Sequence, residues 1–252
     1  MHLDGEGGPR WSPSPDGPPQ IEGLDRPVAA VVNLWAPPVL GATGPQLRAR
    51  RQAAVTRTQA LAAWIGARSQ RPAVLVQLGS ALSFADRGAR SLDEDDAIGG
   101  DPDADIFGAH ERAAASVAAA GLRVVQLRVG LVLAPGLGLT AALAPLLRLG
   151  LRPRRLGAWI PWIGLEDLCD VVRAAVSAPQ LDGPVHLVSP GQLSGPALLE
   201  ALAGRRLLPA PRRLCQRIAP HIDLDGVLGQ SRRLRPSALL ALGFQPRRPW
   251  PA

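Results

Sequence analysis

Strand-length apolar runs alternate with helix-length segments along this chain, and that alternation constrains its fold more than any other feature. Four runs rich in Val and Leu have the composition of strands buried on both faces: residues 28–35, 72–78, 122–133 and 183–189. Between them, three segments have helical spacing of apolar residues or an Ala-rich composition: residues 44–68, 106–121 and 165–178. Strand, helix and strand in repetition predict an α/β fold with a doubly wound parallel sheet.

The two ends of the chain differ from this alternating part. Residues 1–25 lack an apolar period, and we expect an irregular N-terminal segment there. The strands fall in residues 26–190, which we expect to form the α/β domain. In residues 191–252 short helical pieces alternate with prolines, which predicts a small, mainly helical C-terminal lobe. Its first helix is expected between the cap Ser194 and the stop Gly204.

Two residue types are absent, and their absence excludes some chemistry. The chain has no Tyr, and all 28 of its basic residues are Arg, so it has no Lys. A mechanism that needs a phenol or a primary side-chain amine therefore cannot run on this chain. Cys169 and Cys215 lack CxxC spacing and are expected to be buried free thiols. The four histidines are scattered and predict no metal site.

The chain also has a long uncharged stretch and an uneven distribution of charge. Residues 129–147 have the length of a membrane span, but Pro135, Pro145 and three glycines favour a strand, a loop and a helix. The N-terminus is acidic rather than basic and then apolar, so we expect no signal peptide and a cytoplasmic location. Residues 148–252 carry 15 Arg and 7 acidic residues. Without interleaved aromatics they favour a solvated basic face, and an Arg-rich binder of nucleic acid or acidic surfaces stays open.

Six segments in this order and spacing resemble one family over roughly residues 25–248. They are AVVNLWAPPV (30–39), VLVQLGSALSFADRG (74–88), AHERAAASVAAAGLRVVQLRVGLVL (109–133), WIPWIGLEDL (159–168), GPVHLVSPGQLSG (183–195) and LGQSRRLRPSALLALGF (228–244). The family is that of the atypical extended short-chain dehydrogenase/reductases, the NAD(P)-dependent epimerase-like proteins. The resemblance implies a Rossmann-like sheet that binds NAD(P), with a substrate cleft between its carboxyl edge and the C-terminal lobe.

The chain departs from the family at its start. The family opens with a strand, a glycine-rich turn and a helix whose N-terminus holds the pyrophosphate. Here the match begins at about the third strand, and DGEGGPR (4–10) is not that turn. We therefore expect a Rossmann-like sheet that lacks the first βαβ unit, in an N-terminally truncated, degenerate member. A mis-called start codon would look the same. The exposed edge near residues 28–35 is expected to be covered by the N-terminal segment, a partner chain or a dimer mate.

The candidate cofactor-binding and catalytic residues are those that match functional positions of the family. Asn33, Trp35, Gly79 and Ser80 match cofactor-binding positions. Trp35 and Ala36 replace Ala-Gly, so the indole would fill nucleotide space or pack over the sheet edge. The family's Ser-Tyr-Lys proton-transfer set keeps only Ser80, and the expected structural role of Ser80 is to cap local backbone groups. His110 and Glu111 stand where the family has Trp-Glu; they are speculative catalytic residues, or surface residues of an Ala-rich helix.

Four residues are candidates for the substrate cleft: Phe84, Trp159, Trp162 and Asp167. Phe84 replaces a family tyrosine, and the two tryptophans can instead pack between sheet and lobe. Asp167 can instead complement the dipole at a helix start. The acidic run 93–96 is expected to be a solvated loop.

The sequence leaves the function open between enzyme and non-enzyme. Without Tyr, Lys or a glycine-rich phosphate turn, the favoured interpretation is a pseudoenzyme, a binding or assembly subunit without turnover and without a cofactor. The alternative is an active NAD(P)-dependent oxidoreductase or epimerase whose N-terminal unit is missing or mis-annotated. The substrate, the partner and the oligomeric state are not readable from these residues.

Overall fold

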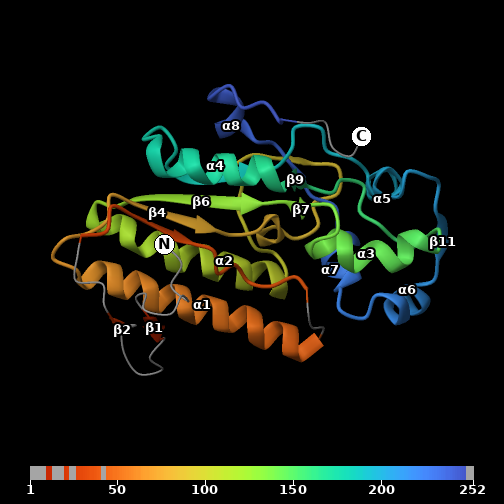
Figure 1. Ribbon diagram of the computed structural model, residues 1–252, viewed down its shortest axis with the longest axis horizontal. Coiled ribbons are helices and arrows are strands. Elements are labelled where there is room, and N and C mark those ends of the chain that lie inside the picture. The colour runs from red at the N-terminus through yellow and green to blue at the C-terminus, as the bar shows by residue number, and fades with distance from the viewer. Residues whose placement is uncertain (1–9, 13–19, 23–26, 41–43, 248–252) are drawn as a thin grey trace.

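A four-stranded parallel sheet forms the centre of the molecule (Figure 1). The computed structural model describes residues 10–12, 20–22, 27–40 and 44–247. The strands lie in the order β10-β6-β4-β3, and their bounds are Gly183–Leu187, Arg123–Val129, Val74–Leu78 and Ala30–Asn33. Val32 pairs with Val76, and Val76 with Val125, so one row of valines crosses three strands. The predicted doubly wound, Rossmann-like α/β fold is confirmed.

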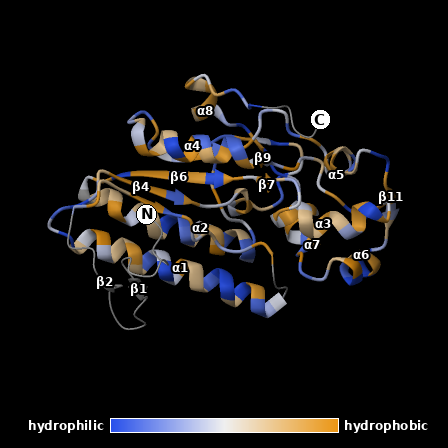
Figure 2. Ribbon diagram, viewed as in Figure 1, coloured by the Kyte–Doolittle hydropathy of each residue, from blue (hydrophilic) through white to orange (hydrophobic). Residues whose placement is uncertain are grey.

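Helices cover both faces of this sheet (Figures 1 and 2). On one face lie α1 (Gly44–Ala67) and α2 (Pro102–Ala115). On the other lie α4 (Leu165–Ser177) and α8 (Ser237–Ala241). Because strand side chains alternate between the faces, Leu75 packs with the α1 side and Val74 and Val76 pack with the α4 side. Each face thus has its own apolar core.

A mainly helical lobe lies beyond the carboxyl ends of the strands. Its helices are α3 (Gly138–Arg148), α5 (Gly195–Ala203), α6 (Arg212–Ile218) and α7 (Leu224–Leu228). Two short strands, β8 (Leu151–Pro153) and β11 (Leu208–Ala210), pair beside them. As predicted, Ser194 caps α5 and Gly204 ends it with a positive φ of 64°. The expected domain boundary at 190/191 stays a prediction.

The predicted strand 122–133 is divided in two, which corrects the sequence interpretation. β6 ends at Val129, and β7 (Leu131–Leu133) leaves the main sheet to pair with β9 (Trp162–Gly164). The break falls at Gly130, where a Cβ atom would lie 2.8 Å from the backbone of Pro161 and Trp162. Only glycine allows these two segments to cross so closely.

Among the described helices, none combines the length and the apolar composition of a membrane-spanning segment.

Three further expectations are corrected. The N-terminal segment expected to be irregular contains two short strands, β1 (Arg10–Ser12) and β2 (Gln20–Glu22), which pair with each other. The acidic run is not simply solvated, because Glu94 is buried and accepts hydrogen bonds from the backbone N–H groups of His186 and Ala238. This run follows β5 (Ser91–Leu92), which pairs with β12 (Arg233–Leu234). Cys215 is buried as expected, whereas Cys169 is exposed.

The edge strand β3 pairs with β4, and no other described strand joins it. Val32 and Leu34 are exposed there, Leu34 by 65% of its surface. β1 and β2 do not cover this edge as strands. A partner or dimer mate at this edge stays a prediction.

Candidate active site

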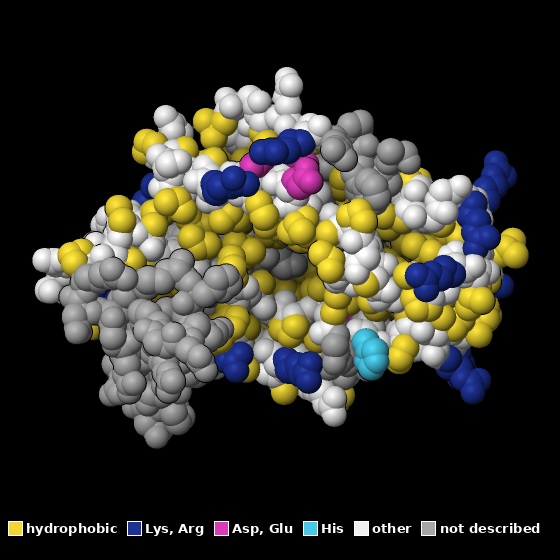
Figure 3. All heavy atoms as spheres, viewed as in Figure 1, with side chains coloured by type: hydrophobic (Ala, Val, Ile, Leu, Met, Phe, Trp, Pro, Cys, Tyr) yellow, Lys and Arg dark blue, Asp and Glu magenta, His cyan; other side chains and the backbone are white. Residues whose placement is uncertain are grey.

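A cavity of about 450 Å³ opens at the carboxyl ends of β4 and β6. Figure 3 shows hydrophobic side chains gathered around a hollow near the middle of this face. The walls come from the segment after β3, from the ends of β4 and β6, from β7, and from the starts of α3 and α4: Ala36, Pro37, Val39, Leu40, Leu78, Gly79, Ser80, Val129–Val132, Ala134, Leu137–Leu139, Leu165 and Leu168. In open parallel sheets this edge is where ligands bind.

Ser80 is the one protic side chain among the described residues that line this cavity. It follows β4 directly and is half-buried. Its Oγ accepts a hydrogen bond from the N–H of Leu82 at 3.1 Å and so caps the 3₁₀ turn Ala81–Ser83. Ser80 therefore both caps this turn and lines the cavity. Accepting one hydrogen bond leaves its O–H group able to donate.

Asn33 and Trp35 lie behind the cavity wall rather than in it. The buried Asn33 amide donates to Thr58 Oγ1 at 3.1 Å and to Gln77 Oε1 at 2.8 Å, and its Oδ1 accepts from the Trp35 N–H. Trp35 is not among the described lining residues; the Arg57 guanidinium lies 4.7 Å from the centre of its ring. Of the two roles expected for this indole, packing beside the sheet edge fits this position better. The space beside Ala36 stays open.

His110 and Glu111 point to different partners, as adjacent helical positions should. Both are buried, so the expected surface position is wrong. His110 Nε2 donates to the Trp35 carbonyl at 2.8 Å, and burial lowers the pKa of His110 to about 4. The ring is therefore neutral near pH 7. It holds the wall of the cavity and does not line it.

Glu111 forms a buried ion pair with Arg128 of β6. Arg128 Nη2 lies 2.6 Å from Glu111 Oε1, and Arg128 Nε lies 3.0 Å from Oε2. Arg128 Nη1 also donates to the Glu94 carbonyl at 2.7 Å. With both carboxylate oxygens engaged, Glu111 joins α2 to the sheet and is not aimed at the cavity.

The four expected cleft residues make packing and capping contacts, and none is among the described lining residues of this cavity. Phe84 is buried and meets the His186 ring edge-on at 5.6 Å. Trp162 is buried in the core of the lobe, and the Trp159 ring lies under the Arg233 guanidinium at 4.3 Å. Asp167, in the first turn of α4, accepts the Arg247 N–H at 2.9 Å.

Known proteins resemble this chain over most of its length. No protein-family profile matches it. Epimerase family proteins of Mycobacterium bovis and Mycobacterium tuberculosis are each 29% identical over 231 residues, which cover 86% of this chain and 74% of theirs. The chain is similar to proteins of the epimerase family over most of its length. The resemblance drawn from the six sequence segments is confirmed.

Solved structures share the fold of this chain. The human epimerase family protein SDR39U1 (isoform 2), solved with NADPH, superposes with a TM-score of 0.74 at 23% identity, covering 90% of this chain and 80% of that one. A nucleoside-diphosphate sugar epimerase from Corynebacterium glutamicum gives 0.69 at 24% identity, covering 89% and 44%. At these identities the structures show the fold alone.

Most of the cavity walls were not predicted from the sequence. Gly79 and Ser80 were predicted site residues, whereas Gly130, Leu131 and Leu165 were not. The missed walls come from the segment after β6 and from the first turn of α4. A signal was present, because the apolar run 122–133 contains a glycine where the strand must leave the sheet.

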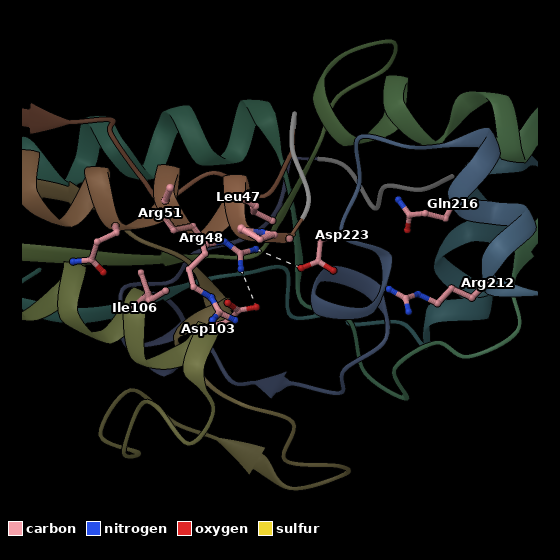
Figure 4. A pocket seen from close by; sticks show the side chains of 12 residues that line it. Leu47, Arg48, Arg51, Asp103, Ile106, Arg212, Gln216 and Asp223 are labelled. Carbon is pink, nitrogen blue, oxygen red and sulfur yellow. Dashed lines mark ion pairs between the residues drawn. The ribbon is translucent and has the colours of Figure 1, made fainter.

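A second, larger cavity of about 820 Å³ lies between α1, α2, α6 and α7 (Figure 4). Arg51 lies at its centre and is only 2% exposed. Its Nη1 lies 3.0 Å from Asp103 Oδ2, its Nη2 lies 3.7 Å from Asp223 Oδ2, and its Nε donates to the Pro38 carbonyl. Because Arg51 is already fully engaged, we read this cluster as a clamp between the sheet domain and the lobe.

Proposed function

We propose that this protein is an NAD(P)-dependent oxidoreductase or epimerase whose chemistry takes place in the cavity beside Ser80. The observation that carries the proposal is a roomy apolar cavity at the carboxyl ends of β4 and β6 with one hydroxyl in its wall. Similarity to epimerase family proteins supports it, and so does the NADPH in the human structure.

The cavity fits one end of such a cofactor. Its wall combines apolar side chains with the backbone of residues 78–80 and 129–132, a surface suited to a flat nicotinamide ring. When bound, that ring would supply or take up the hydride. The start of α3 brings Gly138 to this cavity, but this segment follows β7 and is not the turn after the first strand at which the family holds the pyrophosphate, so we assign no residue to the cofactor phosphates.

Ser80 would hold the substrate oxygen. Its O–H donates to a carbonyl or hydroxyl oxygen, while the Leu82 N–H fixes the position of Oγ. Because the chain has neither Tyr nor Lys, no side chain of those types can relay the proton. The proton that a reduced carbonyl takes up would come from water, which reaches the half-buried Ser80.

A second candidate is a binding protein of the same fold without turnover. It is favoured by one observation: among the described lining residues, Ser80 alone offers a protic side chain. Such a protein would still bind a nucleotide or an apolar ligand. It differs from the first candidate in leaving bound NADPH unoxidised in the presence of any carbonyl substrate.

The test is a titration of the protein with NADPH, in which binding is measured by the fluorescence of the reduced nicotinamide ring. Wild-type protein should bind, and Ala36→Trp, which places an indole in the cavity, should weaken binding at least about tenfold because ring and indole compete for one space. Ala89→Trp is the matched control, since Ala89 is exposed and does not line the cavity. No binding by the wild type, or equal binding by Ala36→Trp, would contradict the proposal.

A further inference from the structure

Two segments far apart in the sequence form a strongly basic end of the lobe. Residues 148–155 and 205–217 carry nine arginines and no Asp or Glu. The segments lie side by side because β8 pairs with β11, and the Arg154 N–H donates to the Ala210 carbonyl at 3.0 Å. We call these two segments the basic end.

The positive charge of the basic end is largely uncompensated. In the part of the chain that the structure describes, ion pairs reach only two of its arginines, Arg152 to Glu200 at 3.9 Å and Arg212 to Asp225 at 2.9 Å. Arg205 donates to the carbonyls of Leu147 and Arg148. All but Arg152 are exposed: Arg148, Arg154, Arg155, Arg205, Arg206, Arg212, Arg213 and Arg217. This concentration of positive charge on one surface favours an anionic partner.

Large apolar side chains stand exposed among these arginines. Leu149, Leu208 and Leu214 expose 62%, 72% and 43% of their surface. They come from the end of α3, from β11 and from α6, three elements that meet at the basic end. Figure 3 shows the same mixture, with dark-blue side chains set around hydrophobic ones at the end of the molecule that carries β11 and α6. Exposed leucines on a basic surface favour a partner that is both anionic and apolar.

We propose that the basic end binds the surface of a membrane that contains anionic lipids. The arginines would contact lipid phosphates, and the three leucines would enter the boundary between headgroups and acyl chains. Nucleic acid fits less well, because it would leave the leucines in water and the basic end has no aromatic side chain for base stacking. This inference is independent of the proposed function, since neither segment lines the cavity beside Ser80.

The experiment is flotation of the full chain with vesicles. One set contains phosphatidylcholine alone, and the other contains phosphatidylcholine with an equal share of phosphatidylglycerol. The protein should float with the anionic vesicles only, and less so at high salt. Arg206→Gln/Arg213→Gln should weaken binding about 25-fold, since each arginine near an anionic surface contributes about fivefold. Leu208→Ser should also weaken it, although it changes no charge.

The control has the same charge change elsewhere. Arg71→Gln/Arg112→Gln removes two exposed arginines outside the basic end and should leave flotation unchanged. Failure of the wild type to float, or equal losses in the two double variants, would overturn the proposal. So would binding to a duplex DNA oligonucleotide together with no binding to vesicles. A Leu208→Ser variant that floats like the wild type would contradict insertion of the leucines.

Discussion

Ser80 uses its hydroxyl in two directions, which makes its substitution informative. Ser80→Ala removes the cap on the 3₁₀ turn and should lower the free energy of unfolding by about 1 kcal/mol. It also removes the donor to the substrate oxygen and should lower kcat roughly 100-fold. The measurements are urea unfolding and NADPH oxidation with a carbonyl compound that the wild type reduces. Ser80→Thr should retain most of both, and unchanged turnover in Ser80→Ala would remove Ser80 from the mechanism.

His110 makes stability depend on pH. Burial lowers its pKa to about 4 in the folded protein, against about 6.5 in the unfolded chain. Between these values the unfolded chain binds more protons, so the contribution of His110 is fully present above about pH 6.5 and is lost as the pH falls toward 4. His110→Gln should remove about 2 kcal/mol of the stability lost between about pH 7 and about pH 5 in urea unfolding. Equal losses of unfolding free energy between about pH 7 and about pH 5 in the wild type and in His110→Gln would contradict this.

Single residues were only partly predictable from the sequence. Ser80 could be placed because the end of a buried strand is a fixed feature of the chain. The burial of His110 and Glu111 could not, since an Ala-rich helix has no distinct apolar face and does not show which side meets the sheet. Their partners lie elsewhere in the sequence, since Trp35 follows β3 and Arg128 lies in β6.

At the scale of elements, the buried pair of Glu111 and Arg128 joins α2 to β6. Glu111→Gln should lower the free energy of unfolding by about 3 kcal/mol, because it leaves a buried guanidinium without its counter-charge. The double change Glu111→Leu/Arg128→Met should lower the free energy of unfolding by less than the sum for Glu111→Leu and Arg128→Met made singly. A double-mutant cycle by urea unfolding measures the difference, and strictly additive effects would show that the pair is not coupled.

The regular elements were predictable, and their breaks were less so. The segments 44–68 and 165–178 became α1 and α4 almost residue for residue, because their spacing is local information. The run 122–133 was divided at Gly130 because of a backbone crossing with Pro161 and Trp162, which lie about thirty residues away in the sequence. Such long-range contacts leave little trace in local composition.

At the scale of the whole molecule, the Arg51 cluster holds the lobe against the sheet domain. Arg51→Met should lower the free energy of unfolding by about 2–4 kcal/mol, because Asp103 and Asp223 lose a shared counter-charge and the Pro38 carbonyl loses its donor. Hydrogen exchange in α7 should speed up more than in β4. Arg48→Met, at an exposed position one turn earlier on α1, is the control and should change little. Equal effects of the two changes would refute the clamp.

The location of a bound nucleotide tests the proposed active site most directly, because the two cavities differ in chemistry. One is apolar and lies at the strand ends; the other is charged and lies around Arg51. The most direct measurement is a crystal structure of the protein with NADPH. We predict the nicotinamide ring in the cavity beside Ser80, between residues 129–132 and Leu165. A nucleotide bound around Arg51 instead, or crystals that take up none at saturating NADPH, would contradict an active site beside Ser80.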